Sequence, residues 1–241
     1  IFKSGVSIII VSLIVWAISC AVNPVTKKRE FMLLSETDEI KLGQQTDEQV
    51  LQIYGYYEDP DLLSYVNTMG KKMGKLSHRP NLDFEFKVLD SPVVNAFAVP
   101  GGFVYFTRGI LAYLNNEAEL AGVMGHEIGH ITARHSAKQY SRAQITQLGL
   151  GIGAMASETF RKYAGVVQFG VGMFFLKFSR DNERQADALG VEYSSKAGFD
   201  SDNMANFFVT LERLNPSSDQ SGLPAWFSTH PNPPDRINAI K

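Results

Sequence analysis

Two histidines four residues apart, with a glutamate between them, form the most chemically distinctive stretch of the chain: His126, Glu127 and His130, within residues 122–135. On a helix of roughly 100° per residue, the two imidazoles project from one face and can converge on one metal ion. Glu127 lies on the adjacent flank. Its carboxylate can there reach a water on that ion without being a ligand, which is the arrangement of a hydrolytic zinc site.

This geometry requires a helix, and the flanking residues predict one. Asn115 and Asn116 are good N-cap residues, and apolar positions recur after them at helical spacing. Gly125 and Gly129 leave room for a neighbouring strand or helix to approach closely. His135 falls about half a turn from the ligand face on the same helix, so we interpret it as a surface or hydrogen-bonded histidine.

A catalytic zinc usually takes three protein ligands, so a third must come from elsewhere. Residues 179–193 predict a second helix, capped by Ser179 or Asp181, on which Glu183 and Asp187 share a face. Glu183 is the candidate third ligand, and Asp187 the candidate acceptor for the outer ring N–H of a ligating histidine. The alternative is an ordinary solvated face, held by ion pairs with neighbouring arginines.

Three blocks in this order resemble one family. They are NAFAVPGGFVYFTRGIL at 95–111, HEIGH at 126–130 and SRDNERQADALG at 179–190. Together they resemble the HtpX and CAAX-prenyl-protease group of zinc metallopeptidases, and within it the soluble bacterial lipoprotein members of the BepA-like and LoiP-like kind. The resemblance extends over most of residues 35–240, without the helical repeats that follow this domain in some relatives.

The resemblance implies one Zn²⁺ per chain, bound by His126, His130 and Glu183, with Glu127 as general base. A developing oxyanion would need a second stabiliser, and residues 227–240 offer His230 and Arg236 for that catalytic role. Family members carry a similar His-Pro segment, and in some of them this histidine can reach the metal. Oxyanion donor, zinc-capping gate and structural packing all remain open for the segment.

Upstream of the histidine helix, the pattern is that of strands. Residues 84–88 alternate apolar and polar side chains, and residues 99–107 predict a strand pair across Pro100, Gly101 and Gly102. The prediction is a small antiparallel sheet beside the helix, within an α+β fold that is mainly helical and of the zincin type.

The family resemblance also favours a role for Asn95, Ala96, Phe97 and Ala98 as an edge strand to which a substrate peptide adds. Backbone pairing reads extended conformation more than sequence, which would make unfolded proteins the natural substrates. The alternative is an ordinary hairpin that packs on the histidine helix.

Composition indicates one globular domain: 241 residues, 44% hydrophobic and 20% charged. The net charge is −2, and the basic cluster at residues 71–79 has the pattern of a helix end with a solvated face. Nucleic acid is therefore not an expected partner.

The N-terminus predicts export. Lys3 precedes an apolar stretch at residues 6–18 that is short for a bilayer span and suits a signal peptide. Cys20, the sole cysteine, would carry a lipid at the cleavage point, and Ala21 after it favours the outer membrane. An uncleaved signal anchor is the alternative. We assign residues 1–20 to the signal peptide, 21–34 to a linker and 35–241 to the catalytic domain.

Two further segments predict helices around the site. Residues 31–78 contain two, beginning near Ser35 or Thr37 and at Asp59 before Pro60. Residues 148–178 are strongly apolar but interrupted by charges, which favours two packed helices over contact with membrane or substrate.

Taken together, the sequence predicts a membrane-tethered zinc endopeptidase that acts on misfolded or unassembled envelope proteins on the periplasmic side, with outer-membrane assembly machinery as a possible partner. A metal-stabilised chaperone or assembly factor that binds chains without cutting them is the alternative from another class, although it would not need Glu127. A latent protease, closed by the His230 segment or by residues 148–178, is the third hypothesis.

Overall fold

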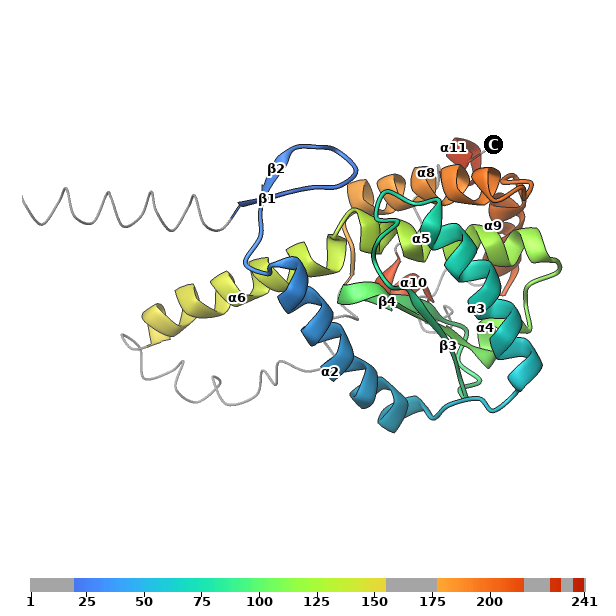
Figure 1. Cartoon of the computed structure of the whole chain (residues 1–241), viewed down its shortest axis with the longest axis horizontal. Helices are drawn as coiled ribbons and strands as arrows, with labels where there is room; N and C mark the ends of the chain where they lie inside the picture. Colours follow the sequence, from blue (N-terminus) through green and yellow to red (C-terminus); the bar gives the residue numbers. More distant parts are fainter. Residues whose placement is uncertain (1–19, 155–176, 215–225, 231–235, 241) are drawn as a thin grey trace, which may run out of the picture.

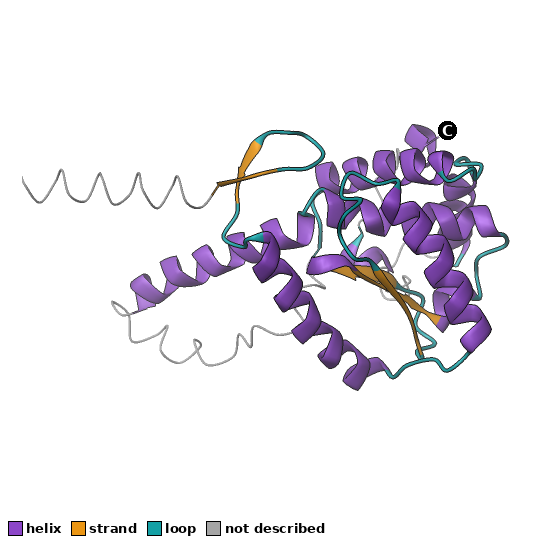
Figure 2. Ribbon diagram, in the orientation of Figure 1, coloured by secondary structure: helices purple, strands orange, loops and turns teal. Residues whose placement is uncertain are grey.

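The computed structural model describes residues 20–154, 177–214, 226–230 and 236–240. Helices dominate these segments, and two small sheets complete them (Figure 2). This confirms the mainly helical α+β class that the sequence predicts.

The first two long helices begin where the capping residues predict. In α2 (Glu36–Tyr54) the side chain of Ser35 accepts a hydrogen bond from the backbone N–H of Asp38, and in α3 (Pro60–Lys75) Asp59 does the same for Leu62. Each cap satisfies an N–H that a helix leaves without an internal partner. The prediction of two helices between residues 31 and 78 is therefore confirmed.

The main sheet has three strands, β3 (Glu85–Leu89), β4 (Ala96–Val99) and β5 (Phe103–Thr107), in the order β3-β5-β4. β4 and β5 are antiparallel and joined by the short 3-10 helix η1 (Pro100–Gly102), as predicted. β3 pairs with β5 in parallel, so the predicted antiparallel sheet is wrong in this strand. Alternation shows that a strand has two faces but not which side of the hairpin it joins. Joining β5 rather than β4 reverses its direction relative to its neighbour.

Helix α5 (Glu117–Thr132) lies between the sheet and helix α8 (Arg180–Lys196), as Figure 1 shows. Every residue from Glu119 to Thr132 is buried. A helix that is buried all round belongs to the centre of its domain, and α5 is the element on which the others are assembled. The other α-helices of the described segments are α4 (Arg108–Leu111), α6 (His135–Ala154), α9 (Asn203–Arg213), α10 (Trp226–Thr229) and α11 (Arg236–Ile240).

One end of the basic cluster at residues 71–79 is not solvated as predicted. Arg79 is 7% exposed, and its guanidinium donates to the carboxylates of Glu39 and Glu36, both at 2.9 Å. The second oxygen of Glu39 accepts from Arg134 Nε, also at 2.9 Å. Buried charges need paired partners, and Glu39 pairs with both arginines. Since Glu39 belongs to α2 and Arg134 follows α5, these ion pairs join the two helices.

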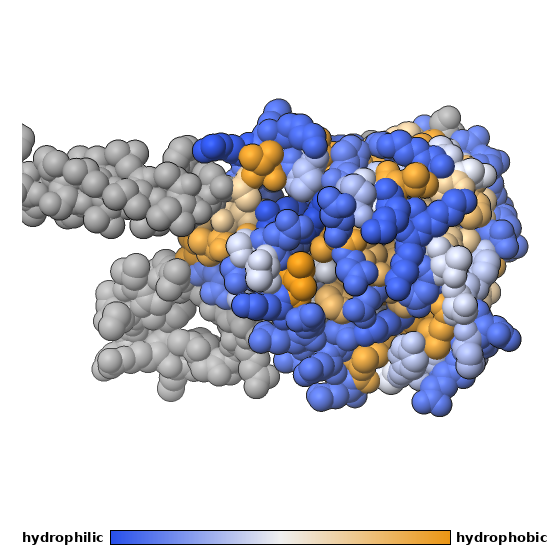
Figure 3. Space-filling view, viewed as in Figure 1, coloured by the Kyte–Doolittle hydropathy of each residue, from blue (hydrophilic) through white to orange (hydrophobic). Residues whose placement is uncertain are grey.

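Several predictions concern residues outside the described ranges: the signal peptide up to residue 19, and the part of the apolar segment from 155 to 176. The region assigned to a linker contains a two-stranded antiparallel hairpin of β1 (Cys20–Val22) and β2 (Arg29–Phe31). Within the described ranges, no helix has both the length and the apolar character that crossing a membrane requires. The face drawn in Figure 3 is mainly hydrophilic, with small, separate hydrophobic areas.

Candidate metal centre

Helix α5 supplies the first donors. The side chain of Asn116 caps the helix by accepting from the N–H of Glu119 at 2.9 Å, so the helix begins two to three turns before the histidines. His126 and His130 are both fully buried, and their Nε2 atoms lie 3.0 Å apart. The helix therefore turns both donor atoms towards one point, as the spacing predicts.

Helix α8 approaches α5 through glycines. A Cβ on Gly125 would lie 2.8 Å from the carbonyl oxygen of Gly190, and one on Gly129 would lie 3.1 Å from that of Ala186. The close approach that the glycines predict is thus made by α8. It brings Glu183, in the first turn of that helix, to the histidines: Oε1 lies 3.5 Å from His130 Nε2, and Oε2 lies 3.7 Å from His126 Nε2.

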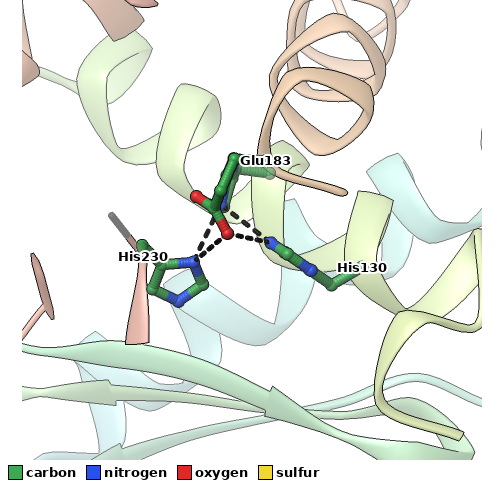
Figure 4. Close-up of side chains that lie close together, drawn as sticks. His130, Glu183 and His230 are labelled. Carbon is green, nitrogen blue, oxygen red and sulfur yellow. Dashed lines mark hydrogen bonds and ion pairs between the residues drawn. The ribbon is translucent and has the colours of Figure 1, made fainter. Parts of the chain in front are cut away.

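His230 enters the same group directly after α10. Its Nδ1 lies 3.2 Å from His126 Nε2 and 3.2 Å from Glu183 Oε1, and Figure 4 shows its ring turned towards Glu183 and His130. Two backbone hydrogen bonds hold α10 across the site: Trp226 N–H donates to Val94 O at 3.1 Å, and Phe178 N–H donates to Thr229 O at 3.0 Å.

These four residues form a group that could hold a metal ion. One donor atom from each lies within 4.8 Å of all the others. A tetrahedron with bonds of about 2.0–2.1 Å has edges of about 3.3 Å. The separations of 3.0, 3.2, 3.2 and 3.5 Å among the donor atoms, with Oε1 for Glu183, are close to that value. Three imidazole nitrogens and one carboxylate oxygen are a donor set that suits zinc and other transition metals.

Behind this group lie the other two charged residues that the sequence singles out. Asp187 Oδ1 accepts from His126 Nδ1 at 2.9 Å, which is where its predicted role would place it. Arg236 donates from Nε and Nη2 to the two oxygens of Asp187, both at 2.7 Å, and its Nη1 lies 3.1 Å from Glu183 Oε2. This guanidinium is committed to the two carboxylates of α8. We therefore replace the oxyanion role considered for Arg236 with that of a support for Asp187 and Glu183.

Glu127 lies beside the donor group, and its carboxylate has no hydrogen-bond partner among the described residues. The side chain is fully buried, and His230 Nε2 lies 3.5 Å from Oε1. Burial raises the pKa of Glu127, and the nearby His230 and His126 only partly oppose that shift. A buried carboxylate with open lone pairs and a raised pKa is suited to take up a proton.

The pKa values of His130 and Glu183 are shifted in the directions that metal binding requires, whereas the pKa of His230 is raised, because the charges of Glu183 and Glu127 outweigh the effect of its burial. Burial lowers the pKa of His130 well below its ordinary value, which keeps the ring neutral. Burial by itself would raise the pKa of Glu183. The charge of His230 and the hydrogen bonds from His130 and His230 outweigh that effect, so the pKa of Glu183 is well below its ordinary value. Neutral imidazole and ionised carboxylate are the metal-binding forms of these groups.

Of the two interpretations of His135, the hydrogen-bonded one is confirmed and the surface one is wrong. His135 is 2% exposed, its Nδ1 lies 3.1 Å from His130 Nδ1, and its Nε2 lies 3.0 Å from Gln185 Oε1. The half-turn estimate assumed one continuous helix, whereas α5 ends at Thr132 and Arg134 has a left-handed backbone with φ of 58°. That bend starts α6 in a new direction and returns His135 to the site.

The predicted substrate strand lies at an edge of the main sheet. Ala96, Phe97 and Ala98 belong to β4, whose one partner among the described strands is β5. Their side chains are buried, and Phe97 stacks on Tyr105 with ring centroids 4.9 Å apart. Asn95, just before the strand, is also buried, and its backbone N–H donates to Thr107 Oγ1 at 3.1 Å.

Two aromatic residues at the site were missed. Phe178 lies with its ring 4.1 Å from that of His130, and the Trp226 indole stacks on His230 at 4.2 Å with an angle of 24°. A weak signal existed for Trp226, because it stands four residues before His230, one helical turn away. For Phe178 we find none, since it ends the apolar segment 148–178, whose aromatic residues we expected to lie in packed helices.

An HExxH helix whose two histidines lie beside a glutamate of a second helix is the arrangement of a metallopeptidase. Comparison with family models gives the same class: residues 61–241 match peptidase family M48, and the chain belongs to that family. The resemblance to HtpX-type and BepA-like peptidases predicted from the motifs is confirmed. The family and the donor group together indicate a metal cofactor.

Individual relatives cover most of this chain. The beta-barrel assembly-enhancing protease of Escherichia coli (strain K12) is 31% identical over 216 residues, which are 85% of this chain and 43% of the relative. The mitochondrial metalloendopeptidase OMA1 of Schizosaccharomyces pombe is 31% identical over 224 residues, 90% of this chain and 64% of the relative. The human OMA1 metalloendopeptidase is 25% identical over 227 residues, 88% and 42% respectively. The chain thus spans about two fifths of the length of the assembly-enhancing protease.

Proposed function

We propose that this chain is a zinc-dependent endopeptidase that hydrolyses peptide bonds of misfolded or unassembled proteins of the bacterial cell envelope. The observation that carries the proposal is the convergence of His126, His130 and Glu183 from two helices, with Glu127 buried beside them and without a hydrogen-bond partner among the described residues. A protein that only bound metal, or only bound unfolded chains, would have no use for a buried carboxylate in that position.

The residues divide the work as follows. His126, His130 and Glu183 would hold the zinc, and Asp187 and Arg236 would hold His126 and Glu183 in place. Bound zinc would supply a water with a pKa lowered to about 7 and a positive charge beside the scissile carbonyl. Glu127 would accept the proton of that water at a carboxylate oxygen and deliver it to the departing amine.

The position of His230 supports a second proposal, that the site is closed at rest. Its Nδ1 occupies the fourth corner of the donor group, at 3.2 Å from both His126 Nε2 and Glu183 Oε1. Hydrolysis needs that corner for water, because a catalytic zinc keeps one position open. We therefore propose a latent peptidase whose cleavage requires the His230 ring to leave.

The substrates would bind as extended strands. β4 lies at an edge of the sheet and packs on α5, so a peptide that paired with its backbone would run beside the donor group. Peptides with an N-methyl group at a single backbone position test this, because N-methylation removes one donor and leaves the side chains intact. Cleavage that is insensitive to every such position would contradict strand pairing.

The proposed location rests on the N-terminal sequence and on the relatives. The signal-peptide pattern before Cys20 supports a lipid-anchored protein on the periplasmic side, with the outer membrane favoured. The name of the Escherichia coli relative refers to beta-barrel assembly, which makes outer-membrane assembly machinery a candidate partner for this chain. Mass spectrometry of the protein isolated from its host would test the lipid on Cys20.

The activity is tested by digestion of an unfolded protein, with and without a chelator. We expect cleavage to be lost with chelator and in Glu127→Gln, while Glu127→Gln still binds zinc. Glu192→Gln is the matched control and should cleave like the wild type, because Glu192 is a half-buried glutamate of α8 that pairs with Lys196 outside the donor group. If wild type and control bind zinc and unfolded protein but neither cleaves, the chaperone or assembly-factor hypothesis replaces this one.

The latent form is tested by His230→Ala. Cleavage should rise if the ring closes the site, and should fall if His230 stabilises an oxyanion instead. His78→Ala is a suitable control, because His78 bonds to Tyr193 and lies outside the donor group.

A further inference from the structure

The two histidines of α5 are supported in different ways on their outer sides. His126 Nδ1 lies 2.9 Å from a carboxylate oxygen of Asp187, whereas His130 Nδ1 lies 3.1 Å from another imidazole nitrogen, Nδ1 of His135. The second arrangement functions only if the two nitrogens carry one proton between them. The protonation pattern of His135 therefore matters for His130.

Metal binding decides where that proton lies. His130 presents Nε2 to the donor group, and Figure 4 shows its other ring nitrogen pointing away. A neutral imidazole that gives its Nε2 lone pair to a metal carries its hydrogen on Nδ1. This N–H must donate to His135 Nδ1, which is then an acceptor and carries no hydrogen.

Gln185 completes the assignment. With Nδ1 of His135 as acceptor, the neutral His135 ring carries its hydrogen on Nε2. That N–H faces Gln185 Oε1 at 3.0 Å, an atom that can accept. The chain of donors thus runs from His130 to His135 to Gln185 with every proton used once and no conflict.

The backbone holds His135 in the position that these hydrogen bonds to His130 and Gln185 require. Arg134 turns the chain through a left-handed conformation, with φ of 58°, which an arginine adopts only at a cost. Its side chain is held by two hydrogen bonds, a buried one to Glu39 Oε2 and a partly buried one to Leu34 O, both at 2.9 Å. Those contacts hold the bend that points His135 back at His130.

We propose that His135 and Gln185 are positioning residues that fix the tautomer and the ring orientation of the metal ligand His130. Neither touches the donor group's centre, and both act through His130. The inference rests on the proposed metal site and deepens it. It also explains why a histidine that the helical repeat directs away from the ligand face is buried.

A matched pair of variants tests this inference. Asparagine can place Oδ1 near the position of His135 Nδ1, whereas leucine has a similar size and no acceptor. We expect zinc affinity, measured by competition with a chromophoric chelator, to fall about 10- to 100-fold in His135→Leu and to stay close to wild type in His135→Asn. At Gln185, the Glu variant should bind zinc like the wild type and the Met variant more weakly.

A spectroscopic readout covers the case in which His135→Leu does not fold. In ¹⁵N NMR spectra of the zinc-loaded wild-type protein, His135 should appear as the Nε2–H tautomer. An Nδ1–H tautomer, or equal zinc affinity in the wild type, His135→Leu and His135→Asn, would overturn the inference and leave the metal site standing. A wild-type protein that bound no zinc would overturn the metal site itself, and this inference with it.

Discussion

The distance between α5 and α8 is the quantity on which the donor group depends, and Gly125→Ala changes it. A methyl group there would lie 2.8 Å from the carbonyl oxygen of Gly190 and 3.0 Å from its Cα. Both are backbone atoms of α8, so no side chain can rotate away. Ordinary contact begins at 3.4 Å, which leaves a shortfall of 3.4 − 2.8 = 0.6 Å.

A shift of that size is large for a metal site. Ligand distances are set to within about 0.2 Å, so a shift of several tenths of an ångström would carry Glu183 out of range of the histidines. We expect zinc affinity to fall by at least about tenfold, the order found when ligands lose their orientation. Overpacking costs about 1–3 kcal/mol of stability, partly offset by the better helix propensity of alanine, about 1 kcal/mol.

The assay is zinc competition together with thermal unfolding, and Gly74→Ala is the matched control. A methyl group at Gly74 would lie 2.7 Å from the ring of Phe84, the residue before β3, and away from the donor group. Both variants should lose stability, while zinc affinity should fall in Gly125→Ala alone. Equal affinity in the two variants would refute the argument that the α5–α8 spacing sets the site.

Three further outcomes are expected. Burial lowers the pKa of His135 from 6.5 to about 4, so between these pH values the unfolded chain binds a proton that the metal-free folded chain excludes. The free energy of unfolding should therefore decrease by about 3 kcal/mol as the pH falls from about 6.5 towards 4. Urea unfolding of the metal-free protein at several pH values should show this slope reduced in His135→Asn, and an unchanged slope would contradict it. Arg236→Leu leaves the buried carboxylates of Asp187 and Glu183 without their cation and should cost about 3–5 kcal/mol in denaturant unfolding. Arg184→Leu, at an exposed pair, should cost less than about 1 kcal/mol, and similar losses in both would count against the support assigned to Arg236. Zinc at about 1,000 times its dissociation constant should stabilise the wild type by about 4 kcal/mol and should not stabilise His126→Ala to that extent; stabilisation of both alike would place the metal elsewhere.

Local signals predicted the local structure well. Ser35, Asp59, Asn116 and Ser179 each cap the helix that the sequence assigns to them, since a capping side chain bonds to an N–H only a few residues away. Hydrophobic alternation and turn residues predicted the β4–β5 hairpin for the same reason, whereas the β1–β2 hairpin in the region assigned to a linker was not predicted. The direction of β3 was missed, because strand pairing is a contact between distant segments.

The same division holds at the site. His126 and His130 share a face because one helix carries both, and the need of a zinc site for a third ligand pointed to Glu183 on a second helix. His135 was misplaced, because a single left-handed residue at Arg134 ends the helical repeat on which the estimate relied. The burial of Arg79 was missed as well, since its partners Glu36 and Glu39 lie about forty residues away in the sequence.

The sequence by itself thus determined the donor types, their helical phase and the family, because these depend on residue identity and on spacing within one helix. Tertiary structure decided that His230 lies against His126 and Glu183, that Arg236 contacts the carboxylates of α8, and that His135 stands behind His130. The first two contacts form only when α8, α10 and α11 pack on α5, and packing between distant segments leaves no periodic trace in the chain. The third depends on the left-handed backbone of Arg134, which ends the helical repeat and which the spacing of the residues does not reveal.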